Sequence, residues 1–199
     1  MPISGLGLSS GTKARVLEIC GLGLLAFVAA LASIKAAPGP AGYLGAALAL
    51  LMLAVAVIDA RWFIIPDQLS AAGFALGLIN AAVIAPEEMW QAAGIAFARG
   101  AVLALLFYAV RTLYRRLRGR QGIGLGDVKL AAVAGAWLDW LTMPIAVEIA
   151  ALAALGVIGI RHYGSGPRLD AALKFPFGLF LAPSIWACWL LEATLLAPR

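Results

Sequence analysis

Residues 41–59 read AGYLGAALALLMLAVAVID, a continuous apolar run that ends at Asp59. An α-helix needs about 20 apolar residues to cross the hydrocarbon core of a bilayer, so this run predicts a transmembrane helix. Comparable runs recur along the whole chain. The sequence therefore predicts an all-α fold, a polytopic membrane helix bundle with about seven transmembrane helices, at 16–34, 41–58, 69–85, 91–110, 127–142, 144–160 and 177–196.

The composition agrees with a membrane protein. Of the 199 residues, 63% are hydrophobic and 13% are charged, whereas soluble domains have roughly 45–50% apolar and about 25% charged residues. The apolar residues lie in long runs, which favours helices over the alternating strands of a membrane β-barrel. We expect a short basic N-terminal tail, 1–15, followed by a single transmembrane domain, 16–199.

Cysteine and histidine are too sparse to suggest a metal centre. The chain has two cysteines, Cys20 and Cys188, in apolar runs near opposite ends, and one histidine, His162. There is no Cys-x-x-Cys motif, so we predict neither a zinc site nor a disulfide. The formal net charge of +5 matters less than the positions of the basic residues, and we expect no nucleic-acid partner.

The basic residues indicate how the helices are oriented. If the predicted helices alternate in direction, the loops 59–68, 111–126 and 161–176 share one side with the N-terminus. The 15 lysines and arginines all fall on that side except Lys35, Arg99 and Arg199. Because cytoplasmic loops carry the excess of Lys and Arg, we expect the N-terminus and these loops to face the cytoplasm.

Two aspartates stand at the cytoplasmic ends of predicted helices. Asp59 ends the second helix and Asp127 begins the fifth, so both are expected at the same membrane depth. An ionisable group close to hydrocarbon is costly and indicates function, here acid–base chemistry on a membrane-held substrate. The structural alternatives are a solvated Asp59 paired with Arg61, and an Asp127 that only caps its helix.

The residues around Asp127 suggest how it is placed. Gly124 and Gly126 flank Leu125, and glycine suits a backbone that turns sharply or approaches another segment closely. Lys129 lies two residues further on, about 200° around an ideal helix, so we do not expect it on the face of Asp127. The alternative for Lys129 is a side chain that extends to the lipid headgroups.

Three further acidic residues have mainly structural interpretations. Asp67 follows Pro66 and is expected to cap the third predicted helix, with a supporting role near the site as the alternative. Asp139 is expected in a turn at the external end of the fifth helix. Glu148 lies within the sixth helix, where it could be buried and protonated or paired with Arg99.

Three blocks of the sequence resemble the type IV prepilin peptidases, which are GxGD-type intramembrane aspartyl proteases. Residues 58–69, IDARWFIIPDQL, resemble the first aspartate block of that family. Residues 122–138, GIGLGDVKLAAVAGAWL, resemble the second and most diagnostic block, and residues 175–178, FPFG, resemble the final block. The order and spacing agree across about residues 45–190, so 16–199 is expected to be a peptidase domain.

The resemblance implies an aspartic endopeptidase in which Asp59 and Asp127 are the catalytic pair. It implies prepilin-like or pseudopilin substrates, cut after a basic leader and before their hydrophobic N-terminal helix. The expected location is the bacterial inner membrane, with the active site facing the cytoplasm. The expected partners are this substrate and membrane lipid, with no cofactor, and the oligomeric state stays open. We assign supporting or substrate-binding roles to Gly124, Gly126, Asp67 and Lys129.

The chain also departs from the family pattern. Larger bifunctional members carry a cytosolic segment with paired Cys-x-x-Cys motifs and N-methylate the new terminus. This sequence has neither those cysteines nor room for that segment, so we expect a peptidase-only form that resembles those of tight-adherence (Flp-type) pili. Leu179 stands where many relatives have proline.

Two other classes stay open at this point. One is a small proton-coupled transporter or channel, in which Asp59, Asp127 and Glu148 form a relay. The other is a non-catalytic membrane protein of pilus assembly. For the peptidase, the helix dipole predicts that Asp127, at a helix N-terminus, is the resting carboxylate, and that Asp59, at a C-terminus, is the acid.

Overall fold

The computed structural model describes residues 10–119, 122–165 and 176–196. Within these ranges the chain is helical and has no strand, which confirms the predicted all-α class. The elements are α1 (Ser10–Ala36), α2 (Pro40–Trp62), α3 (Asp67–Ile84), a 3-10 turn η1 (Pro86–Glu88), α4 (Met89–Arg118), α5 (Leu125–Trp137), α6 (Thr142–Ser165), α7 (Gly178–Leu191) and a terminal π-helical turn η2 (Glu192–Leu196).

Six of these helices are long and apolar enough to cross a membrane, so the chain is an integral membrane protein. The exception is α5, whose 13 residues reach only about 20 Å at 1.5 Å per residue. A bilayer core is about 30 Å thick. The expected span 127–142 is therefore too long, because residues 138–141 form the turn into α6.

Several helices extend beyond their apolar runs. α1 begins at Ser10, α2 continues to Trp62, and α4 continues through the arginine-rich segment to Arg118. Arginine and leucine are good helix formers, so the chain can stay helical where it is no longer apolar. Part of the expected 111–126 loop is therefore the end of α4.

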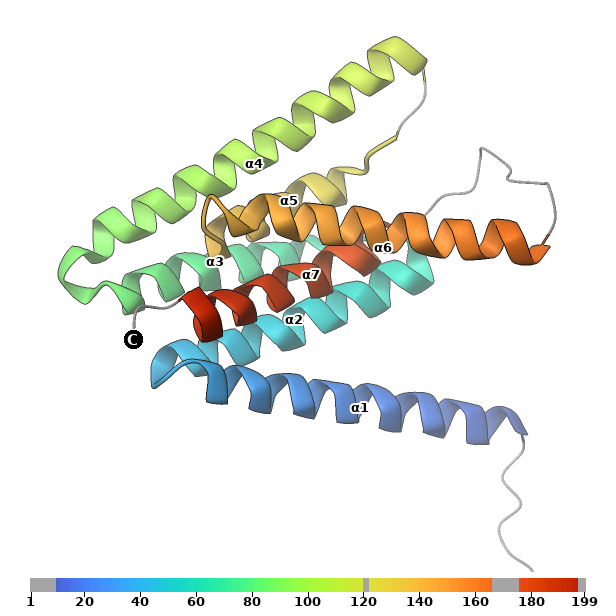
Figure 1. The fold of residues 1–199 in the computed structure, drawn as a ribbon, viewed down its shortest axis with the longest axis horizontal. Helices are drawn as coiled ribbons and strands as arrows, with labels where there is room; N and C mark the ends of the chain where they lie inside the picture. Colours follow the sequence, from blue (N-terminus) through green and yellow to red (C-terminus); the bar gives the residue numbers. More distant parts are fainter. Residues whose placement is uncertain (1–9, 120–121, 166–175, 197–199) are drawn as a thin grey trace, which may run out of the picture.

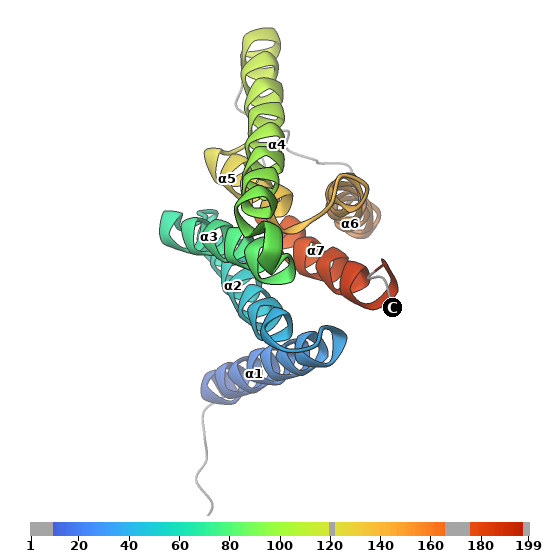
Figure 2. The same ribbon diagram turned by 90° about the vertical axis from the view of Figure 1, so that its left-hand side faces the viewer.

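The short helix α5 lies at the centre of the bundle. It packs against α3, α4 and α7, and α2 packs along α7 on the other side of the core. The outer positions belong to α1, which packs mainly on α2, to α4, which packs on α5 and α3, and to α6, which packs mainly on α7 (Figures 1 and 2). Seven of the 13 residues of α5 are buried, so neighbouring helices rather than lipid surround most of it.

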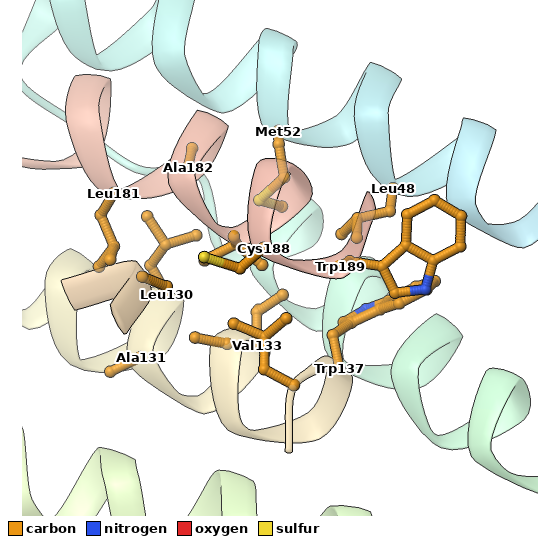
Figure 3. Packing of buried hydrophobic residues seen from close by; sticks show 14 of the residues in the cluster. Leu48, Met52, Leu130, Ala131, Val133, Trp137, Leu181, Ala182, Cys188 and Trp189 are labelled. Atoms are coloured by element: carbon orange, nitrogen blue, oxygen red, sulfur yellow. The ribbon is translucent and has the colours of Figure 1, made fainter. Parts of the chain in front are cut away.

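The core is formed by apolar side chains of α2, α5 and α7 (Figure 3). Trp137 of α5 and Trp189 of α7 meet edge to face, with ring centroids 6.1 Å apart. The indole N–H of Trp137 donates to the carbonyl of Gly73 at 2.8 Å, which ties α5 to α3. The other labelled members of the core are Leu48, Met52, Leu130, Ala131, Val133, Leu181, Ala182 and Cys188.

Glycine brings helix backbones together around α5. A Cβ on Gly135 would lie 2.6 Å from the carbonyl oxygen of Arg99, and one on Gly100 would lie 2.8 Å from the carbonyl oxygen of Ala132. The backbones of α4 and α5 are therefore in direct contact. Small residues serve this purpose in membrane bundles, where close packing replaces the hydrophobic drive of water.

A polar cluster closes the end of the bundle where α5 turns into α6. Arg99 forms an ion pair with Asp139, and the backbone N–H of Asp139 donates to Glu192 at 2.7 Å. Asp139 lies in the turn, as expected. The suggested pairing of Arg99 with Glu148 is wrong, because Arg99 instead takes the carboxylate that the turn presents. Glu148 is exposed in the second turn of α6.

Candidate active site

The end of α2 meets the starts of α3, α5 and α7 at one end of the bundle, the right-hand end in Figure 1. The alternating helix directions bring Asp59 and Asp127 to this end, as the sequence predicts. α5 and α7 are the two shortest helices. α1 and α6 extend further to the right than the starts of α5 and α7 (Figure 1), so this junction is recessed from the ends of the outer helices.

Asp59 lies in the last turn of α2 and is 5% exposed. Its Oδ2 accepts a hydrogen bond from the backbone N–H of Leu179 at 3.0 Å. Arg61 forms an ion pair with Glu18 instead. The alternative of a solvated Asp59 paired with Arg61 is therefore wrong, because the side chain turns inward to the first turn of α7.

Gly178 makes room for the Asp59 carboxylate. A Cβ on Gly178 would lie 2.8 Å from Oδ2 of Asp59, well inside van der Waals contact. The first amides of a helix have no intrahelical acceptor, and they favour a negative group. Asp59 thus occupies the N-terminus of α7 although it belongs to the C-terminal turn of α2. Both aspartates therefore face helix N-termini. The helix dipole does not distinguish them, so it no longer predicts that Asp59 is the acid.

Asp127 is the third residue of α5 and is partly exposed. Its Oδ2 accepts a hydrogen bond from the backbone N–H of Gly124 at 2.9 Å, so the carboxylate does cap its own helix. It also interacts electrostatically with Asp59, which lies 68 positions earlier in the chain. Capping accounts for the hydrogen bond with Gly124 but not for the position of Asp127 near Asp59.

Ile65 fills the space between the starts of α5 and α7. A Cβ on Gly126 would lie 2.9 Å from Cβ of Ile65, and one on Gly178 would lie 2.7 Å from its Cδ1. Ile65 is 7% exposed, although it lies in the connection between α2 and α3. Sequence reasoning did not single out this residue. The available signal was an apolar residue placed directly before Pro66, in a connection that should otherwise be polar.

Neither glycine before Asp127 has a left-handed backbone, and Gly126 allows the close approach of another segment. Gly124 has φ −72° and ψ 157°, an extended conformation open to any residue. In the described part of the chain, only Gly39 and Gly119 among the glycines have positive φ. Gly126 is needed because the Ile65 side chain packs against it.

Asp67 and Lys129 form an ion pair at the rim of the site. Nζ of Lys129 lies 2.5 Å from Oδ1 of Asp67, and both side chains are substantially exposed. The expectation that Asp67 caps α3 is wrong, because Pro66 holds the cap position and Asp67 is the first helical residue. The pair connects the start of α3 to the start of α5.

The arrangement offers two carboxylates at a recessed helix junction, one buried and one partly exposed. Within the described ranges, no three His, Cys, Asp or Glu side chains converge in a way that could hold a metal ion. Phe175, the first residue of the third sequence block, lies outside the described residues, whereas Phe177 is the N-cap of α7 and Gly178 is its first residue. The site can therefore support acid–base chemistry by paired carboxylates.

The fold and the site define a polytopic helical membrane protein that brings two aspartates together at one end of the bundle. Residues 46–160, more than half of the chain, match the type IV leader peptidase family. The chain belongs to this family. The match includes both aspartates.

Curated relatives agree with this assignment. A prepilin leader peptidase/N-methyltransferase of Burkholderia pseudomallei is 36% identical over 157 residues, which cover 72% of this chain and 45% of that protein. The leader peptidase HopD of Salmonella typhimurium is 33% identical over 130 residues, 65% of this chain and 81% of that protein. The chain thus spans about half the length of the larger relatives. No solved structure matches it significantly.

Proposed function

We propose that the protein is an aspartic endopeptidase that removes the basic leader from type IV prepilin-like or pseudopilin precursors, with Asp59 and Asp127 as the catalytic pair. Membership of the type IV leader peptidase family supports the reaction. The observation that carries the proposal is that Gly178, which lies against Asp59, and Gly126, which precedes Asp127, pack on the same side chain, Ile65, at the junction of α2, α5 and α7. None of these helices needs this arrangement in order to begin or end there.

The two carboxylates divide the acid and base roles of peptide hydrolysis. One is ionised and takes a proton from the attacking water, and the other is protonated and polarises the scissile carbonyl before it passes its proton to the leaving amine. Two carboxylates at close range share one proton more readily than they ionise together. Partial exposure of Asp127 gives water a route to the pair, while burial of Asp59 limits competing hydrogen bonds from solvent.

The backbone before Asp127 suits an extended substrate. A peptide must be extended to be cut, and an extended peptide is held well by backbone groups of the enzyme. Residues 122–124 precede α5 without helical structure, and Gly124 is extended. The N–H of Gly124 already binds Asp127, so other backbone groups of residues 122–124 would have to hold the substrate.

We place the site at the cytoplasmic face of the inner membrane. The helix ends around it carry Arg61, Lys129 and the arginines at the end of α4, as expected for a cytoplasmic surface. A basic leader needs acidic partners there. Glu18 and Asp67 are close to this end, and each is held by a basic residue of the chain itself. Lysines or arginines of the leader can replace those internal partners.

The proposal is limited to leader cleavage. The relatives from Burkholderia pseudomallei and Aeromonas hydrophila are named for N-methyltransferase activity as well. We propose no such activity here, since the 199 residues contain only two cysteines and no Cys-x-x-Cys motif.

The test is cleavage of a precursor by purified protein in lipid nanodiscs. The substrate carries a basic leader followed by an apolar helix, and mass spectrometry identifies the products. We expect one new N-terminus between the leader and the helix. Cleavage within the apolar helix, or an intact precursor, would contradict the proposal. A proton flux in proteoliposomes that Glu148→Gln abolishes, without cleavage, would favour a transporter instead.

A further inference from the structure

A groove of about 450 Å³ runs along the bundle between α1, α2 and α7. On α1 it is lined by Glu18, Leu22, Leu25 and Ala29. These positions are spaced by four, three and four residues, so they form one face of the helix. The remaining walls are apolar residues of α2 and α7, and the only charged lining residues within the groove lie at one end.

The groove leads to the catalytic junction. Leu179 lines it, and the backbone N–H of the same residue donates to Oδ2 of Asp59. Ala56 of α2, three residues before Asp59, and Ala60, the residue after it, also line the groove. Asp59 itself does not line the groove, so a segment lying there would approach it at the start of α7, beside Leu179.

The two ends of the groove differ in chemistry. At the end away from the aspartates, the indole N–H of Trp186 donates to the hydroxyl of Ser33 at 2.9 Å and joins α7 to α1. At the other end, Glu18 and Arg61 form an ion pair between half-exposed side chains. The groove thus matches a segment that is apolar along its length and charged at the end nearest Asp59.

The helix α1 is mostly uncovered by the rest of the bundle, which leaves one side of the groove accessible. Only 11% of the apolar stretch of α1 is buried inside the bundle, against 44% of that of α2. α1 lies along α2 near the turn that joins them and diverges from it toward the aspartate end (Figure 1). Leu25 is 56% exposed although it faces the groove, so a second apolar surface can still cover it.

We propose that this groove holds the hydrophobic N-terminal helix of the precursor. This inference rests on the proposed function, because it takes its substrate class from there. The substrate helix runs parallel to α1, with its N-terminus beside Glu18 and Arg61 and with the scissile bond just beyond it, next to Asp59. The leader then meets Glu18, which exchanges Arg61 for a basic residue of the leader.

The dimensions fit one face of a helix. From Glu18 to Ala29 the lining of α1 extends about 17 Å at 1.5 Å per residue. That length corresponds to about three helical turns, so side chains at i, i+4, i+7 and i+11 of the substrate insert while its opposite face stays in lipid. The volume is too small for a whole helix, which agrees with insertion of one face only.

Photo-crosslinking tests the location independently of cleavage. A benzophenone amino acid is introduced at Leu25 in the groove or, as the control, at Leu152 on α6, which is 69% exposed. Both are placed in the Asp127→Asn variant, so that the precursor stays intact. We expect crosslinks from position 25 to the hydrophobic helix of the precursor and none from position 152. Crosslinks from 152 alone, or from 25 to lipid alone, would overturn the proposal.

Filling the groove tests its contribution to catalysis. Leu25→Trp should raise KM for the precursor about tenfold, because the larger side chain keeps roughly one apolar side chain of the substrate helix out of the groove. It should leave unchanged the cleavage of a short peptide that has the leader and scissile bond but no apolar helix. Leu152→Trp should affect neither substrate. An unchanged KM for the precursor, or equal losses with both substrates, would overturn the proposal.

The two arms separate this inference from the proposed function. If the wild-type protein cleaves neither substrate, the proposed function fails. Crosslinking then tests the groove inference by itself. A crosslink from position 25 to the apolar helix of the precursor supports the groove inference, and the absence of that crosslink overturns it.

Discussion

Gly178→Ala should inactivate the site while leaving the fold intact. The added methyl would lie 2.8 Å from Oδ2 of Asp59 and 2.7 Å from Cδ1 of Ile65, whereas ordinary contacts begin at 3.4 Å. The carboxylate must therefore retreat by about 0.6 Å, the difference between 3.4 and 2.8 Å. A misplacement of about 1 Å at a catalytic group can cost about 100-fold. We expect kcat to fall by about 10- to 100-fold.

The measurement is precursor cleavage under single-turnover conditions, together with thermal unfolding in the same detergent. Gly156→Ala on α6 is the matched control, because a Cβ there has no neighbour within 4 Å. Adding Ile65→Val to Gly178→Ala removes the Cδ1 contact and should restore only part of the activity, since the contact with Asp59 persists. Activity of Gly178→Ala within about twofold of wild type, with an unchanged fold, would refute the positioning role of α7.

Three further predictions follow from single contacts. Leu179→Pro removes the N–H that binds Asp59 at a helix position where proline is tolerated and where the family pattern noted above has proline, so kcat should fall by no more than about tenfold. Gly45→Ala places a Cβ 1.8 Å from Trp189 and should destabilise the protein by about 1–3 kcal/mol in thermal unfolding. Lys129→Ala breaks an exposed ion pair and should cost less than about 1 kcal/mol in stability.

The controls separate these effects from general damage. Leu179→Ala keeps the N–H and should retain most of the activity, so equal losses in both variants would contradict a role for the hydrogen bond. Gly23→Ala on α1 has open surroundings and should leave the melting temperature unchanged. A large stability loss in Lys129→Ala would show that the rim pair holds α3 and α5 together.

The membrane bundle was predictable because apolar runs report directly on transmembrane helices. The runs located all seven helices and the all-α class. They did not give the helix ends, since α4 continues on arginine and leucine after its apolar run stops at about residue 110. Nor did they show that α5 is short, because the apolar turn residue Leu138 continues the same hydrophobic signal.

The location of Asp59 and Asp127 at the same end of the bundle was predictable from topology, since alternating helices place both there. The partners of each carboxylate were not. Asp59 belongs to the end of α2, and nothing local to it indicates that its side chain binds the N-terminus of α7, 120 residues later. Sequence periodicity describes faces within one helix, whereas such contacts depend on how helix ends meet.

The supporting residues show the same limit. Asp67 after Pro66 fits a helix cap by local rules, yet its carboxylate pairs with Lys129, 62 residues away. Ile65 was overlooked because a connection is expected to be polar and exposed. Its burial against Gly126 arises only once α5 and α7 begin at the same place.

The most direct test of this account compares the rates at which Asp59→Asn and Asp127→Asn variants cleave a precursor in nanodiscs. Asparagine keeps the shape of each side chain but can neither take nor donate the catalytic proton. The account predicts that each single substitution lowers the rate by at least about 100-fold, while the precursor still crosslinks at the groove. Substantial cleavage by either variant would contradict a reaction carried by both carboxylates.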